Sequence, residues 1–271
     1  YGSPITSSST YSGGFAQLST TLAASGGHYN SGDTAYINFL DISNGGLSNS
    51  ATYNITATGS GTMRGIDPGH MSPGSSSTSV YAMGGIVSSY NGYYLYELTS
   101  SGTIPYWNRV YLPSGEMFPR GMTTLSTGHV VVVATYRDTG NQEWLGFVVH
   151  TPTTLEIEAA YFIVNQADSG WTGGNNSYAS ELSNGNVLIG DWYFIAEVNL
   201  NISNNVVGTP TIVRHLSISR SDNFHENAAG NIVVSNSQTT PWFAEYQPNG
   251  SGYDFVTGRQ LIYPVSGSGS S

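Results

Sequence analysis

The sequence predicts an all-β protein built from five repeated units. An aromatic or apolar run followed by a turn recurs about every fifty residues, at 35–40, 93–98, 144–149, 193–198 and 242–246. Strand-like runs fill the chain between these points, and Gly or Pro interrupts the stretches before a helical period can develop. A unit of this length cannot bury a core alone, so the units must stack into one body.

The third unit shows the order of its strands most clearly. Strand-like runs cover residues 118–125, 129–136, 143–149 and 155–164, with a short turn or loop after each of the first three. This order is typical of a four-stranded antiparallel meander. The stretch 130–134 is apolar at every position, as expected for a strand that neighbouring units cover on both faces.

The other units repeat this order with different fidelity. The phrase Leu-Ser-x-Gly-x-Val occurs at 125–130 and again at 182–187, and Gly230 marks the same point in the fifth unit. Such a glycine predicts a positive φ in a tight connection between strands. The first two units are more degenerate, and we interpret the Ser-rich stretch 72–79 as a surface loop.

Five four-stranded units in series resemble a five-bladed β-propeller, a resemblance of architecture that implies a ring of blades around a central channel. The period and the strand order carry it, since WD, kelch and RTX calcium signatures are missing from the sequence. The alternative architecture is a β-sandwich or jelly roll. We expect an N-terminal arm at 1–14, a single propeller domain at 15–265 and a flexible tail at 266–271. The arm would reach a neighbouring subunit or supply the outer strand that closes the ring.

The charge of the chain limits its possible partners. Charged residues make up 9% of the sequence, the net charge at pH 7 is -10, and all seven basic residues are arginine. A nucleic acid or an anionic lipid surface would require a basic face, so neither partner is expected. No apolar run reaches the roughly 18 residues that a membrane span needs. A surface of Ser, Thr, Asn, Gly and Tyr depends little on charge, which favours an extracellular protein, either secreted, at a cell surface or in a virion.

Several classes of chemistry are excluded by missing residues and motifs. The sequence has no cysteine, which excludes disulfides, zinc-thiolate centres and thiol nucleophiles. It also lacks a Gly-x-Ser-x-Gly elbow, a Walker loop, a His-Glu-x-x-His pair and a Rossmann fingerprint. We therefore expect neither a cofactor nor a metal site.

Two glutamates are the candidate catalytic residues. Aligning the units on Gly128, Gly185 and Gly230 places Glu181 and Glu226 at one position of adjacent inner strands. Carboxylates that converge across a channel are the groups that a glycoside hydrolase uses as general acid and base, and Asp67 is the candidate third acid. The simpler interpretation is that they are isolated polar residues facing a water-filled channel.

Candidate ligand-binding residues fall in two polar segments and at one tryptophan. Arg64, Asp67 and His70 share a Gly/Pro-rich segment that would bind an anion or a sugar, or would simply form a turn. Asp222 and His225 lie in the densest polar run, which lacks a recognisable metal-ligand spacing. The third candidate is Trp171, in a segment that resembles the Asp-box turn of sialidase-like propellers but occurs once and lacks the leading Ser or Thr.

These observations favour a non-catalytic extracellular module. It would bind a glycan or another cell-surface ligand, or it would associate with copies of itself in an appendage, a filament or a virion. Abundant Tyr with Ser, Gly and Asn suits adaptable binding, because aromatic rings stack on sugar faces while amides and hydroxyls pair with sugar hydroxyls. The alternative is a glycoside hydrolase of the five-bladed type, for which the alignment supplies two of three expected acids.

Overall fold

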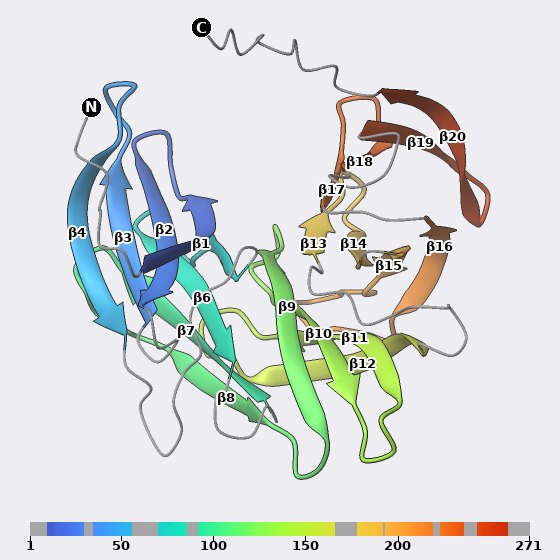
Figure 1. Cartoon of the computed structure of the whole chain (residues 1–271), viewed down its shortest axis with the longest axis horizontal. Helices are drawn as coiled ribbons and strands as arrows, with labels where there is room; N and C mark the ends of the chain where they lie inside the picture. The colour runs from blue at the N-terminus through green and yellow to red at the C-terminus, as the bar shows by residue number, and fades with distance from the viewer. Residues whose placement is uncertain are drawn as a thin grey trace, which may run out of the picture.

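The described residues form twenty strands in five four-stranded antiparallel sheets (Figure 1). The structure is a computed structural model, and it describes residues 10–29, 35–55, 70–85, 92–165, 178–191, 193–218, 223–235 and 243–259. Within this part of the chain, no helix is long and apolar enough to cross a membrane.

Each sheet uses four consecutive strands, and we call the sheets blades 1 to 5 in chain order. Blade 1 contains β1 (Thr10–Gln17), β2 (Leu22–Tyr29), β3 (Ala35–Asp41) and β4 (Ser48–Ile55). Blade 2 contains β5 (Met71–Pro73), β6 (Ser79–Gly85), β7 (Gly92–Thr99) and β8 (Trp107–Tyr111). Blade 3 contains β9 (Glu116–Thr124), β10 (Val130–Arg137), β11 (Glu143–His150) and β12 (Ile157–Asn165). Blade 4 contains β13 (Tyr178–Glu181), β14 (Val187–Gly190), β15 (Phe194–Asn199) and β16 (Thr211–Ser217). Blade 5 contains β17 (Asn223–Glu226), β18 (Ile232–Ser235), β19 (Phe243–Asn249) and β20 (Gly252–Arg259).

The blades are arranged around a common centre. The first strands contact one another in the order β1, β5, β9, β13 and β17, so they lie innermost, and the fourth strands lie at the periphery (Figure 1). The prediction of an all-β five-bladed propeller is confirmed. The described parts of all five predicted aromatic runs fall on or next to the third strands β3, β7, β11, β15 and β19.

The apolar core lies between blades, because side chains of a strand alternate between its two faces. Val131 and Val133 of β10 pack toward blade 4, whereas Val130 and Val132 pack toward blade 2. All four side chains are fully buried, which explains why 130–134 is apolar at every position. Burial of each valine stabilises the fold by about 1.5–3 kcal/mol.

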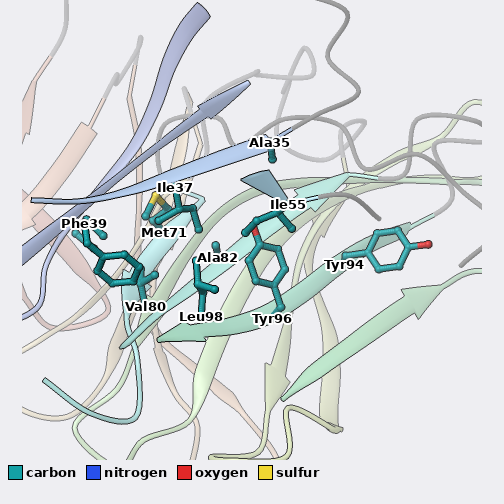
Figure 2. Packing of buried hydrophobic residues seen from close by; sticks show 12 residues of the cluster. Ala35, Ile37, Phe39, Ile55, Met71, Val80, Ala82, Tyr94, Tyr96 and Leu98 are labelled. Carbon is teal, nitrogen blue, oxygen red and sulfur yellow. The ribbon is translucent and has the colours of Figure 1, made fainter. Parts of the chain in front are cut away.

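Four such clusters join the blades in series among the described residues. They lie between blades 1 and 2, 2 and 3, 3 and 4, and 4 and 5. Figure 2 shows the first cluster, in which Phe39 of β3 and Ile55 of β4 pack with Leu98 and Tyr96 of β7. The described residues form no comparable cluster between blades 5 and 1.

Two predicted boundaries need correction. β1 begins at Thr10 and pairs with β2, so residues 10–14 of the predicted arm belong to the innermost strand of blade 1, not to an outer strand. The Ser-rich stretch 72–79 is a surface loop at its centre, where residues 75–78 form an exposed turn, but its ends Ser72 and Ser79 are buried in β5 and β6. Residues 266–271, the predicted tail, lie outside the described residues.

Candidate functional site

The connections from first to second strand and from third to fourth strand lie on one face of the propeller, which we call the turn face. This follows from the antiparallel order of each blade. Gly128, Gly185 and Gly230 occupy equivalent turns there with φ of 86°, 81° and 78°. The positive φ predicted for these glycines is therefore present in blades 3, 4 and 5. A residue with a side chain would strain the backbone in this conformation.

The two aligned glutamates join neighbouring blades on the turn face. Glu181 accepts hydrogen bonds from the backbone N–H and the hydroxyl of Ser126, each at 2.7 Å. Glu226 accepts the same pair from Ser183, at 2.6 Å and 2.8 Å. In both cases the serine lies in the first turn of the preceding blade. We call each of these contacts an interblade clamp.

The third aligned residue makes a related contact. Thr124 donates its backbone N–H to the Ser72 hydroxyl and its own hydroxyl to the Pro73 carbonyl, each at 2.7 Å. The position four residues before the turn glycine thus binds the preceding blade in three successive blades. The sequence alignment therefore identified structurally equivalent residues, and the observed role of these residues is to connect blades.

This geometry bears directly on the predicted catalytic pair. Both oxygens of Glu181 and both oxygens of Glu226 are occupied by serine donors of a neighbouring turn. A general acid or base must instead reach the substrate with a free oxygen. Asp67, the third candidate acid, lies outside the described residues.

A second set of glutamates, which the sequence analysis missed, stabilises the turns of blades 2, 4 and 5 from within the same blade. Glu97 accepts from the Ser75 and Ser79 hydroxyls at 2.6 Å and 2.5 Å. Glu197 accepts from Asn184 and Asn186, and Glu245 accepts from Asn227 and Asn231. One sequence feature marks these glutamates: each lies on a third strand, two positions after an apolar residue.

Glu197 also links blades 4 and 5. The Tyr253 hydroxyl of β20 donates to it at 2.9 Å, and Arg214 of β16 lies 3.3 Å away. Burial acts to raise the pKa of Glu197, but hydrogen bonds from Asn186, Asn184 and Tyr253, with the charge of Arg214, lower it overall. This nearly buried carboxylate is therefore held in its charged form.

A polar pocket of about 410 Å³ opens on the turn face between blades 3 and 4. Three segments line it: the β9–β10 turn, the β13–β14 turn and the start of the β15–β16 loop. Its lining residues are Leu125, Ser126, Thr127, Glu181, Asn184, Gly185, Asn186, Asn199, Leu200, Asn201 and Ile202. The lining combines amides and hydroxyls with one carboxylate, and it contains no cationic side chain.

Two asparagines shape the loop that closes the pocket. Asn199 accepts the backbone N–H of Asn201 at 2.7 Å, and the Asn201 side chain donates to the Thr209 carbonyl. Asn201 adopts a φ of 51°, which asparagine tolerates better than most residues. These bonds use the Asn199 amide oxygen and the Asn201 amide nitrogen, and within the described structure the Asn199 amide nitrogen and the Asn201 amide oxygen make no hydrogen bond.

The predicted ligand-binding residues do not form a single described site. His70 is buried beside β5, while His225 of β17 is exposed. Four others, Arg64, Asp67, Trp171 and Asp222, lie outside the described residues. They fall between β4 and β5, β12 and β13, or β16 and β17, where the flanking strand ends lie opposite the turn face. Within the described chain, no group of three or more His, Cys, Asp or Glu side chains can hold a metal ion.

Comparison with known proteins supports the architecture alone. No protein-family model and no curated protein matches the sequence. Among solved structures, the Hadza microbial sialidase Hz136 is similar with a TM-score of 0.56 and 11% identity, over 89% of this chain and 56% of that one. The uncharacterized protein lmo1340 of Listeria monocytogenes has a TM-score of 0.37 and 10% identity, over 94% of this chain and 65% of its own. The chain therefore spans just over half of the sialidase, and the likeness defines a propeller fold.

Proposed function

We propose that this propeller is a carbohydrate-binding module that holds a neutral glycan in the pocket between blades 3 and 4 without cleaving it. The lining of that pocket is the observation that carries the proposal. Sugars present hydroxyls that both donate and accept hydrogen bonds, and amide side chains offer both functions. The volume of about 410 Å³ lies in the range of small-ligand sites.

The charges around the pocket favour a neutral ligand over an acidic one. Glu181 contributes a carboxylate, and no arginine lines the pocket. The chain as a whole carries a net charge of -10. An anionic sugar would meet repulsion there without a compensating partner, so an uncharged oligosaccharide fits better.

Glycan cleavage, the activity named for the sialidase of similar fold, is the alternative function. The interblade clamps argue against glycan cleavage, because both carboxylate oxygens of Glu181 and of Glu226 accept hydrogen bonds from the turn of the preceding blade. We also propose that the protein acts outside the cell, which its low content of charged residues favours. There it would bind its ligand or associate with copies of itself in an appendage, a filament or a virion.

A glycan array with matched pocket variants tests the proposal. Thr127→Trp fills the pocket mouth with a bulky ring, whereas Thr127→Ser keeps the hydroxyl that contacts His129 at 2.9 Å. We expect wild type and Thr127→Ser to bind the same neutral glycans, and Thr127→Trp to lose them. Equal binding by all three proteins would exclude this pocket, and sugar release by wild type would favour the hydrolase.

A further inference from the structure

The outer strand of blade 2 exposes an unusual set of side chains. In β8 (Trp107–Tyr111), the register pairs Trp107 with Tyr96 and Arg109 with Tyr94. Trp107, Arg109 and Tyr111 alternate with Val110, which is buried toward blade 3. These three residues therefore continue the face of blade 2 that packs on blade 1, at the periphery of the molecule (Figure 1).

The rings on this strand are largely open to solvent. Trp107 is 52% exposed and Tyr111 is 54% exposed, although the rest of blade 2 is well packed. Tyr106 and Ile104, in the preceding loop, are also exposed. Trp107 and Tyr111 share one face of β8, and large exposed rings that share a surface mark a binding site more often than isolated ones do.

Arg109 lies between two aromatic rings and has no acidic partner among the described residues. Its guanidinium carbon is 5.1 Å from the centre of the Tyr111 ring and 5.6 Å from that of Tyr94. Figure 2 shows Tyr94 at one end of its cluster, with its hydroxyl directed away from the other labelled side chains. Among the described residues, the buried Nε of Arg109 has no hydrogen-bond partner, as is also the case for the Nε of Arg214.

Two other described arginines form ion pairs with glutamates. Arg137 pairs with Glu116 and Glu143, and Arg214 pairs with Glu197. Arg109, by contrast, has no ion pair or side-chain hydrogen bond within the described structure. A guanidinium that two aromatic rings orient, and that has no ion pair among the described residues, is suited to receive a carboxylate from outside.

We propose that Trp107, Arg109 and Tyr111 form a second, independent site that binds a carboxylated sugar in an acidic polysaccharide. The apolar face of a sugar ring stacks on Trp107 or Tyr111, and the sugar carboxylate pairs with Arg109. Trp107 and Tyr111 are four residues apart on an extended strand, about 13 Å, so a polymer fits better than a single sugar. The site lies on a different blade from the pocket and does not depend on the function proposed for it.

Polygalacturonate and its fully methyl-esterified form provide a matched pair of probes, because they share ring faces and differ in the carboxylate. Tryptophan fluorescence is titrated with each polymer at 0.15 M salt, where the Debye length of about 8 Å screens the overall repulsion. We expect wild type to prefer the acidic polymer by roughly tenfold, the loss expected when one charge-assisted hydrogen bond is removed.

The variants separate the roles of the three side chains. Arg109→Gln should abolish the preference for the acid and Arg109→Lys should keep part of it, while Trp107→Ala should weaken binding of both polymers. Phe162→Ala, which removes another exposed ring on β12, should bind both polymers like wild type. Circular dichroism confirms that each variant is folded.

Three outcomes would overturn the proposal. They are equal affinity for the two polymers, an unchanged preference in Arg109→Gln, and no binding of either polymer by wild type. Sedimentation velocity completes the test: if Trp107→Ala changes only the association state of the protein, this face is a contact between copies and not a sugar site.

Discussion

Burial holds His150 neutral at the boundary of blades 2 and 3, where its ring makes two hydrogen bonds. Its Nδ1 lies 2.8 Å from the Leu155 carbonyl, and its Nε2 lies 2.7 Å from the Tyr93 hydroxyl. A carbonyl only accepts, so Nδ1–H donates to it and Nε2 accepts from Tyr93. The ring is fully buried, and this burial lowers its pKa to about 4.

We expect the protein to lose stability through His150 as the pH falls. The unfolded histidine titrates near 6.5 and the folded one near 4, so the folded state binds fewer protons between these values. The contribution, about 3 kcal/mol at most, is complete above pH 6.5 and is lost as the pH falls toward 4. Urea unfolding from pH 7 to pH 4.5 measures it. His150→Gln should remove this loss, and an identical slope in the variant would refute the assignment.

Asp191 has the opposite dependence. Burial raises its pKa to about 7, while its Oδ1 accepts the backbone N–H groups of Tyr193 and Phe194 at 2.9 Å and 3.0 Å. The folded state therefore binds the proton more tightly, and stability is lost as the pH rises from 3.8 through 7. Asp191→Asn keeps an oxygen acceptor without the charge. It should raise the free energy of unfolding at pH 8 by about 2 kcal/mol and have little effect at pH 4, as calorimetry at both values would show.

The turn glycines allow a prediction about backbone strain. Gly185 has a φ of 81°, and no atom lies within 4 Å of the place that an added Cβ would occupy, so Gly185→Ala should cost about 1 kcal/mol from its backbone alone. At Gly128 the added carbon would also lie 3.2 Å from Pro152, and Gly128→Ala should cost more. Thermal melts of the two variants compare these effects, and equal losses would show that the proline contact has no influence.

Among the elements, the β13–β14 turn is joined both to its own blade and to the next one. The β13–β14 turn binds Glu197 of its own third strand through Asn184 and Asn186, and it binds Glu226 of blade 5 through Ser183. A blade is thus fixed to its neighbour by apolar burial in the interior and by a carboxylate at the turn face.

A double-mutant cycle measures one interblade clamp. Glu181→Ala and Ser126→Ala should each reduce the free energy of unfolding by about 1–2 kcal/mol, because a charge-assisted hydrogen bond is lost. The double variant should lose less than the sum of the two. Glu156→Gln, which changes an exposed carboxylate on the β11–β12 turn, serves as the control. Strictly additive losses would mean that the two residues do not interact.

Strands and turns were predictable where local pattern and burial agree. The stretch 130–134 and the glycine turns are examples, since burial on both faces requires unbroken apolar residues and a left-handed turn requires glycine. β1 was missed because its Ser- and Gly-rich sequence resembles an unstructured arm, and pairing with β2 overrides that weak local preference.

The candidate site was only partly predictable, for a different reason. Alignment placed Glu181 and Glu226 correctly on equivalent inner strands, but their direction toward the preceding turn depends on how blades dock. The pocket combines segments from two blades, and Asn201 becomes significant only once its loop lies beside the β9–β10 turn. The single sequence carries no signal for such contacts.

At the scale of the whole molecule, the propeller depends on burial between blades and on few ion pairs. The described ion pairs number four, and one of them involves a histidine. The carboxylates instead bind neutral donors such as serine, asparagine and tyrosine. Ligands are proposed at two separate places, the pocket between blades 3 and 4 and the outer edge of blade 2.

We propose that Glu181 and Glu226, the glutamates aligned by the repeat, hold blades together and take no part in catalysis. To test this, sugar release from a panel of polysaccharides and the urea midpoint of unfolding are measured in the same preparations of wild type and Glu226→Gln. Glu226 accepts both of its hydrogen bonds from Ser183 and lies outside the pocket. We predict a lower midpoint for Glu226→Gln and no difference in sugar release between the two proteins. Release by wild type that Glu226→Gln abolishes at an unchanged midpoint would contradict the account.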